Sequence, residues 1–293
     1  MATKRTFGES IFGIINIIFL TTLGFSMLFP FINVLAKSLS SSSAVASGTV
    51  FLLPKDIQFG TYKHVLHQGQ LLTSFKNTVF ITVVGAALSM IITVMTAYPL
   101  SKKYLRGRRF IMLLFVFSML FGGGMIPNYL LMKTLGLLNN IWALILPSMM
   151  STFNMIVIKT FLESLPESVE ESARVDGASS MRILFSIVFP MALPSIATVG
   201  LFYAVDYWNN YFSAVMYITD PALKPLPQYL YDLIADAVNP DSITAANVDQ
   251  AMNATPEGIR CATIIVSTLP ILCVYPFLQK YFVKGITIGS VKE

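Results

Sequence analysis

The chain has 293 residues, of which 55% are hydrophobic and only 12% are charged, whereas soluble domains carry about 25% charged residues. Its net charge is +5 and its mean hydropathy is +0.68, which excludes an ordinary soluble enzyme and indicates a protein of the lipid bilayer. Basic loops beside anionic lipid explain the positive charge without a nucleic-acid partner.

Six apolar stretches are each close to the length of about 20 residues that crosses the hydrocarbon core of a bilayer. Backbone amides inside lipid must be satisfied within a helix. The sequence therefore predicts an all-α, polytopic membrane bundle of six transmembrane helices, in one domain over residues 1–293. The stretches are 12–35, 79–100, 110–131, 141–161, 195–218 and 259–278.

The first long loop, at residues 36–73, begins with a Ser/Ala-rich run at 38–49 that is typical of a flexible outer connection. A short interfacial helix is expected around Lys63. His64 and His67 are three residues apart, but no acidic or cysteine side chain near them completes a metal site. We therefore expect no metal here.

Lysine and arginine are distributed unequally between the two sets of loops. With the N-terminus inside, 13 of the 20 basic residues fall on the cytoplasmic side, many of them in the run KKYLRGRR at 102–109. The positive-inside rule favours this orientation. It predicts that both termini are cytoplasmic.

Residues 163–194 form a charged, small-residue loop between the fourth and fifth stretches. Pro166 suits the first turn of a helix, and the three glutamates that follow it lie near the positive end of the helix dipole. Gly177 can adopt the left-handed conformation that ends a helix, and Ser179 or Ser180 can cap a second one. The sequence predicts two short helices joined by a tight turn.

The fifth stretch carries a carboxylate at Asp206, where a charge inside the bilayer costs at least about 2.5 kcal/mol. Steps of three and four residues from it collect polar side chains on one helix face. That face lines a translocation path or bonds to a neighbouring helix. Amides and hydroxyls suit sugar hydroxyls, and rings, including that of Tyr207, can stack on a pyranose. The predicted path residues are Tyr203, Asp206, Trp208, Asn209, Asn210, Tyr211 and Ser213.

The second long outer loop covers residues 219–257. Apolar residues recur at helical spacing over 227–238, which predicts an amphipathic helix that caps the outer surface. The acidic residues of this loop form either a solvated face or part of a surface that receives an extracytoplasmic partner.

The spacing within residues 163–194 resembles the EAA signature of bacterial ATP-binding-cassette (ABC) importer permeases. In that signature Glu-Ala-Ala is followed by Asp-Gly-Ala and later by Phe, Ile and two prolines. Ser172 stands where the family usually has alanine, and serine is nearly as small. The matching residues are Glu171, Ser172, Ala173, Asp176, Gly177, Ala178, Phe185, Ile187, Pro190 and Pro194.

Other fragments resemble the smaller membrane subunit of maltose-type carbohydrate importers. They lie at 74–78, 97–102, 123–129 and 142–147. The opening KRTFGESIF and the tail KGITIGSVKE look most like the subgroup that imports complex and acidic oligosaccharides, such as alginate. A carboxylate at Asp206 is an awkward neighbour for such a sugar unless it is protonated or paired with a cation.

The resemblance implies a type I ABC importer permease fold, half of a translocation path, and a place in the bacterial cytoplasmic (inner) membrane. It also implies that a separate ATPase grips the loop through Glu171, Ser172, Ala173, Asp176, Gly177 and Ala178. The sequence has no G-x-x-x-x-G-K-[ST] phosphate loop, so ATP and Mg²⁺ are expected on the partner ATPase and no cofactor on this chain. The expected partners are a second homologous permease, two ATPase subunits and an extracytoplasmic solute-binding protein.

Three alternatives stand beside this interpretation. A secondary transporter driven by an ion gradient should show paired intramembrane charges and broken helices repeated between halves, and only Asp206 answers that description. An ABC permease for a solute other than sugar is the second. A membrane enzyme needs a histidine, serine or acid constellation at membrane depth, whereas both histidines lie in an outer loop.

Overall fold

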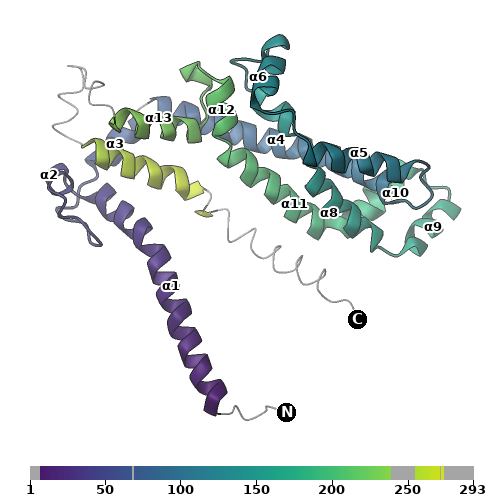
Figure 1. Ribbon diagram of the computed structural model, residues 1–293, viewed down its shortest axis with the longest axis horizontal. Coiled ribbons are helices and arrows are strands. Elements are labelled where there is room, and N and C mark those ends of the chain that lie inside the picture. The colour runs from purple at the N-terminus through teal and green to yellow at the C-terminus, as the bar shows by residue number, and fades with distance from the viewer. Residues whose placement is uncertain (1–6, 68, 239–254, 271, 274–293) are drawn as a thin grey trace. The chain divides into compact units, whose positions relative to one another are not determined.

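The computed structural model describes residues 7–67, 69–238, 255–270 and 272–273, and every regular element within them is a helix (Figure 1). The chain divides into two compact units, one of residues 1–69 and 232–269 and the other of residues 70–231 and 270–293. The all-α prediction is confirmed for the described residues, and the single domain stays a prediction.

Three helices are long and apolar enough to cross a bilayer, namely Ile11–Leu39, Gly69–Ser101 and Ser180–Asn209. The first two contain the first and second predicted stretches. The third begins well before the predicted start of the fifth stretch, because the loop's second short helix runs on into the span. These helices make the chain a multi-pass membrane protein.

Two further spans are broken rather than straight. Arg108–Leu120 and Met125–Thr134 meet at 106°, and Trp142–Ser148 and Thr152–Glu163 meet at 48°. Gly124, at φ 84°, begins the second helix of the first pair. Five spans result if each pair counts as one. The sixth predicted stretch is helical over 256–270, and its far end, like the tail KGITIGSVKE, lies outside the described residues.

The first unit is dominated by α1 (Phe7–Leu39), whose apolar side chains are exposed along most of its length. A helix that is hydrophobic all round is suited to lipid or to another chain. Only its end is held within the unit. Lys37 lies 3.2 Å from the carboxylate of Glu257, and the Ser38 hydroxyl is hydrogen-bonded at 2.7 Å to that of Tyr62.

The outer connection after α1 is more ordered than its composition suggested. The run at 38–49 contains α2 (Ser42–Ala46), and the Ser41 hydroxyl accepts a hydrogen bond from the Ala44 amide at 3.3 Å. Serine favours helix N-caps for this reason. Part of the run is therefore helical, and its flexibility stays a prediction. The short helix expected around Lys63 is confirmed as α3 (Gly60–His67).

The second unit holds the larger core. In it, α11 packs against α8, α5 packs against α8, and α12 packs against α6 and α7. The amphipathic helix expected over 227–238 is present as α13, which begins in this unit, and its place on the outer surface stays a prediction. The elements are α4 (Gly69–Ser101), α5 (Arg108–Leu120), α6 (Met125–Thr134), α7 (Trp142–Ile145), η1 (Leu146–Ser148), α8 (Thr152–Glu163), α9 (Glu167–Val175), α10 (Ser180–Ile183), η2 (Leu184–Val188), α11 (Phe189–Asn209), α12 (Phe212–Tyr217), η3 (Pro221–Leu223) and α13 (Leu226–Val238).

Small residues on one face of α4 make room for tyrosine side chains that reach it from α11. Gly85, Ser89 and Thr93 are four residues apart and therefore share that face. A Cβ on Gly85 would lie 2.8 Å from the ring of Tyr207. The hydroxyls of Ser89 and Tyr207 are 2.9 Å apart, and those of Thr93 and Tyr203 are 2.7 Å apart. Small residues and polar cross-links are the means by which membrane helices associate.

The same two tyrosines also reach the broken fourth span. The Tyr207 hydroxyl donates to the Ile145 carbonyl at 3.1 Å, and the Ser151 amide donates to the Tyr203 hydroxyl at 3.0 Å. Both rings are buried. Each tyrosine therefore joins three segments of the second unit.

We predict that Gly85→Ala lowers the stability of the protein by about 1–3 kcal/mol, the usual cost of overpacking a filled core. The Tyr207 ring cannot move aside, because its hydroxyl is held on two sides. The free energy of unfolding in detergent, from a denaturant titration, checks this. Gly200→Ala on α11 is the control, since its new methyl would meet only Met90 at 3.7 Å; equal losses in both variants would contradict the prediction.

Candidate functional site

The two short helices predicted in the 163–194 loop are present as α9 and α10. We call these two helices and the turn between them the knuckle. Pro166 is the N-cap of α9, and the helix ends at Asp176. Gly177 follows at φ 79°, its amide donates to the Arg174 carbonyl at 3.0 Å, and the Ala178 amide donates to the Ala173 carbonyl at 2.9 Å. These two bonds make a Schellman motif. The predicted left-handed turn at glycine is confirmed.

The knuckle continues without a break into a membrane span. The Ser179 hydroxyl accepts from the Arg182 amide at 3.4 Å and caps α10. After α10 the chain passes through the π-helical turn η2 into α11, and Ser180–Asn209 behaves as one helix. One tight turn and one continuous helix thus connect α9 to α11.

The six predicted coupling residues divide into an exposed set and a packed one. Glu171, Ser172, Asp176 and Gly177 are exposed on the knuckle, whereas Ala173 is buried and Ala178 is half-buried. Val175 is 88% exposed, although an apolar side chain gains nothing from water. The outer face of the knuckle therefore has the small, partly apolar character of a docking surface.

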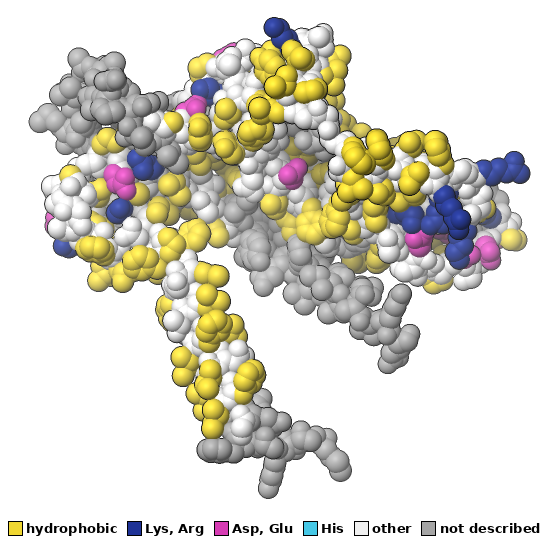
Figure 2. Space-filling view, in the orientation of Figure 1, with side chains coloured by type: hydrophobic (Ala, Val, Ile, Leu, Met, Phe, Trp, Pro, Cys, Tyr) yellow, Lys and Arg dark blue, Asp and Glu magenta, His cyan; other side chains and the backbone are white. Residues whose placement is uncertain are grey.

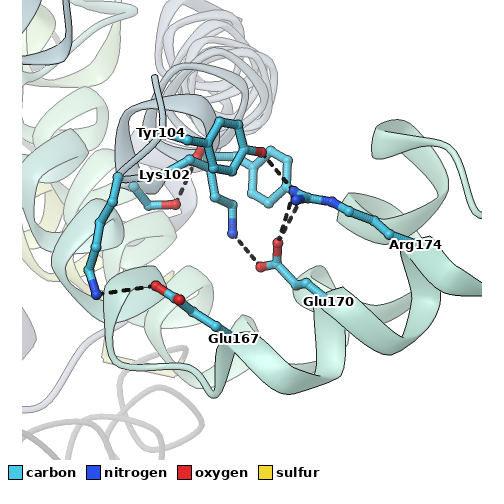
Figure 3. A network of polar contacts seen from close by, with 8 residues as sticks. Lys102, Tyr104, Glu167, Glu170 and Arg174 are labelled. Atoms are coloured by element: carbon cyan, nitrogen blue, oxygen red, sulfur yellow. Dashed lines mark hydrogen bonds and ion pairs between the residues drawn. The ribbon is translucent and has the colours of Figure 1, made fainter. Parts of the chain in front are cut away.

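The inner face of α9 carries a buried carboxylate, Glu170, that the sequence analysis did not assign to a partner. It forms an ion pair with Lys102 at the end of α4, and it accepts a hydrogen bond from the Tyr98 hydroxyl at 3.4 Å (Figure 3). Arg174, one turn along α9, lies 3.9 Å from the same carboxylate. We call the cluster of Glu170, Lys102, Tyr98 and Arg174 the α9–α4 brace.

Two flanking contacts extend the brace. Arg174 donates to the Tyr104 hydroxyl at 2.7 Å, and its guanidinium lies 5.1 Å from the centre of that ring. Lys103 and Glu167 form a second ion pair at 3.3 Å (Figure 3), but their side chains are 79% and 69% exposed. The side chains of Lys102 and Glu170 are only 13% and 11% exposed. The Lys102–Glu170 pair therefore contributes more to the attachment of α9 than the Lys103–Glu167 pair, because water screens the exposed charges.

Sequence reasoning missed this pairing. It placed Glu170 near the dipole of its helix and treated 97–102 only as a fragment that resembles a family. Arg174 stands four residues after Glu170, which is a local pairing signal. No such signal exists for Lys102, because it lies 68 residues away in the chain.

The predicted path residues lie where α11 stops. The helix ends at Asn209, Asn210 and Tyr211 form a break, and α12 resumes at Phe212. The Asn210 side chain accepts from the Ser213 amide at 3.3 Å across that break. The fifth stretch, predicted as one helix to residue 218, is therefore interrupted, and its polar side chains do not form one continuous stripe.

The residues of that stripe face different ways. The Tyr203 ring, like that of Tyr207, is buried inside the bundle, where its hydroxyl is hydrogen-bonded to neighbouring segments. Asp206 and Asn209 are exposed, and the Asn209 amide bonds to its own helix at the Val205 carbonyl, 2.9 Å away.

The aromatic members of the predicted path have ring partners. Trp208 meets Phe75 edge-on at 6.2 Å, and Tyr211, which is 42% exposed, lies 5.4 Å from Tyr231. Half-buried Ser213 lies just beyond the break. Their part in a substrate path stays a prediction, as it does for Tyr203, Asp206, Asn209 and Asn210.

Asp206 makes no hydrogen bond or ion pair with the described residues, and it is exposed on a helix that crosses the bilayer. A carboxylate at such a depth faces protein or water rather than lipid. The surface around Asp206 is therefore suited to a water-filled cavity or to a second chain.

Residues 82–288 match the protein family described as "Binding-protein-dependent transport system inner membrane component". The protein LplC of Bacillus subtilis (strain 168) is 44% identical over 286 residues, which are 96% of this chain and 95% of that protein. The polygalacturonan/rhamnogalacturonan transport system permease protein YtcP of the same organism is 40% identical over 292 residues, 99% of both chains.

A solved structure is also similar over almost the whole chain. It is that of a bacterial ABC transporter involved in the import of the acidic polysaccharide alginate, with a TM-score of 0.91 and 38% sequence identity, and the match covers 96% of this chain and 100% of that one. The resemblance to ABC permeases for carbohydrates, including the alginate type, is confirmed. So is the type I permease fold.

We predict a coupling free energy of about 3 kcal/mol between Glu170 and Lys102 in a double-mutant cycle, because breaking a buried ion pair leaves one charge uncompensated. The variants are Glu170→Gln, Lys102→Met and their combination, measured by unfolding of the purified permease in detergent. Glu167→Gln with Lys103→Met is the matched cycle on the same two elements, and we expect about 1 kcal/mol or less there. Similar coupling free energies in the two cycles would show that the buried pair stabilises the protein no more than the exposed pair does.

Proposed function

Because this chain belongs to the binding-protein-dependent transport system inner membrane components, we propose that it forms one half of the translocation path of an ATP-driven sugar importer. It is a transport subunit. ATP and Mg²⁺ are bound by two partner ATPase subunits, and a second homologous permease completes the path. An extracytoplasmic binding protein delivers the substrate.

The knuckle of α9 and α10 is the single observation that carries this proposal. A docking element transmits force only if it is stiff, and α9 is stiffened at its end by the Schellman motif and on its inner face by the brace. Its outer face, with Glu171, Asp176 and Val175, is left exposed for the ATPase. A push on α9 then moves α11 through the chain and α4 through Glu170.

The orientation follows from the same end of the second unit. Basic side chains gather where α9 meets the loop between α4 and α5 (Figure 2). Because positive loops favour the cytoplasmic side, we place the knuckle and both termini in the cytoplasm of a bacterium, with the chain in its inner membrane. This placement supports access by a cytoplasmic ATPase.

The opposite end of the second unit supports a rigid platform for the binding protein. The Asn139 side chain, in the α6–α7 connection, accepts hydrogen bonds from the amides of Thr219 and Asp220 at 2.6 and 3.0 Å. The Asn77 amide of α4 donates to the Ala222 carbonyl at 2.9 Å. These bonds fix the segment before α13 to α4 and to the α6–α7 connection.

The substrate that we propose is an acidic oligosaccharide. Two similar proteins support this, because one belongs to an importer of alginate and the other is a polygalacturonan/rhamnogalacturonan transport permease. Exposed Asp206, Asn209 and Tyr211 offer a carboxylate, an amide and a phenol at the helix break. Hydroxyl groups of a sugar can donate to the carboxylate, whereas its own carboxylates are repelled, so Asp206 selects how the chain is oriented as it passes.

We predict that Gly177→Val leaves the permease in the membrane but lowers binding-protein-dependent uptake by about tenfold or more. The substitution forces a branched side chain into the left-handed region, which costs about 1–2 kcal/mol, and opens the turn that holds α9 to α10. Uptake and ATP hydrolysis by the reconstituted complex are the measurements. Glu171→Lys, on the docking face itself, should have the same effect.

Gly48→Val is the matched control for this experiment. Gly48 also follows a helix, α2, at φ 66°, with the Gly48 amide donating to the Val45 carbonyl at 3.1 Å and the Thr49 amide to the Ala44 carbonyl at 3.4 Å. The strain is the same, but the knuckle and the platform around Asn139 are untouched. Comparable uptake defects in Gly48→Val and Gly177→Val would refute the coupling role.

We predict that Asp206→Asn and Asn209→Ala change substrate preference while ATP turnover persists. Loss of the Asp206 charge should raise the uptake of uronate oligosaccharides relative to neutral ones, because a repulsion between like charges is removed. Competition between labelled acidic and neutral oligosaccharides in proteoliposomes measures this ratio. An unchanged ratio for every sugar tested in both variants would remove these residues from the path.

A further inference from the structure

A groove beside the cytoplasmic knuckle is used by none of the functions above. It has a volume of about 800 Å³ and lies where the start of α5 meets the end of α8. Its lining includes four basic residues, Lys103, Arg108, Arg109 and Lys159, which we call its mouth, and apolar residues such as Leu113 and Val116, which we call its wall. It therefore joins a charged region to an apolar one.

The mouth of the groove is positive even after neighbouring acids are counted. Its lining has four basic side chains and no acidic one. Glu163 lies beside it and forms ion pairs with both Arg108 and Lys159. Lys103 has only the exposed pair with Glu167, and Arg109 makes no ion pair with any described residue. The two acids leave an excess of positive charge.

The backbone contributes a second attraction for an anion. The N-cap of α5 is Gly107, at φ 79°, and no side chain caps this helix. Gly107 is itself part of the groove lining. The amides of an uncapped first turn and the helix dipole favour a negative group at this position.

The wall of the groove is built for hydrocarbon. Leu113 is 64% exposed. With a rise of 1.5 Å per residue, Val116 lies about 12 Å along α5 from Arg108, which is far enough for a headgroup and the first carbons of an acyl chain. Figure 2 shows apolar side chains that run up to the dark blue ones at this end of the unit.

We propose that this groove binds an anionic phospholipid, with the phosphate at the start of α5 and an acyl chain along Leu113 and Val116. Free phosphate would not use the apolar wall, and a neutral lipid would not use the four cations. Basic pockets at the cytoplasmic ends of membrane helices are suited to such headgroups. In the orientation proposed above, the phosphate belongs to the inner leaflet. The lipid holds α5 against α8, whose end leads directly into α9.

Native mass spectrometry of the purified full-length permease, titrated with phosphatidylglycerol or phosphatidylcholine, tests this site. We expect tighter binding of phosphatidylglycerol. Arg109→Gln should weaken it about fivefold, which equals the roughly 1 kcal/mol that one basic residue contributes near an anionic lipid surface. Arg106→Gln is the matched control, because Arg106 belongs to the same basic run but does not line the groove. Equal losses in both variants would reduce the site to general surface charge and overturn the proposal.

A second variant and a competitor separate the two halves of the site. Leu113→Gln keeps every cation but makes the apolar wall polar. We therefore expect weaker phosphatidylglycerol binding. Inorganic phosphate at millimolar concentration should not displace the lipid. Full displacement by phosphate, or normal lipid binding by Leu113→Gln, would identify a simple anion site and contradict the lipid assignment. Equal affinity for the two lipids would contradict it as well.

Discussion

The packing of two tyrosines of α11 against small residues of α4 is the constraint on which the second unit depends. Helices in lipid gain no hydrophobic energy from meeting each other, so they are held by packing and by polar cross-links. Gly85 provides the space, and the hydroxyl pairs of Ser89 with Tyr207 and Thr93 with Tyr203 provide the cross-links. Because both tyrosines also bond to the fourth span, one contact sets the register of three segments. The knuckle can act on the membrane only because these segments are already fixed to one another.

The position of α9 follows from that register. Three attachments hold it: the short connection from α8, the Schellman turn into α10 and α11, and the brace to the end of α4. The first two are made by the chain itself and the third by a single buried carboxylate. A buried ion pair is weak evidence for stability, and its best attested use is to specify one arrangement over others. At Glu170 that arrangement is a short helix attached both to the end of α4 and, through α10, to α11.

The two ends of the second unit are built differently. Toward the knuckle, α4 and the Ser180–Asn209 helix run unbroken. At the other end, breaks separate α5 from α6, α8 from α7, and α11 from α12. Irregular backbone at membrane depth is tolerated where it is buried in protein or lines water. The exposed Asp206 beside the last of these breaks agrees with the second case. In the proposed function, the unbroken helices carry force from the knuckle, and the broken helices at the other end leave polar groups available to a sugar.

Local patterns in the sequence determined the all-α class, the apolar stretches, the caps of the knuckle at Pro166 and Ser179, and the left-handed turn at Gly177, because each depends on residues within a few positions of one another. The spacing around Glu171 was also enough to indicate the family. Only the tertiary structure decided that Glu170 pairs with Lys102, that Tyr203 and Tyr207 turn inward while Asp206 stays exposed, and that the fifth stretch breaks at Asn210. The physical reason is distance along the chain: periodicity indicates which residues share a helix face, but not which helix that face meets.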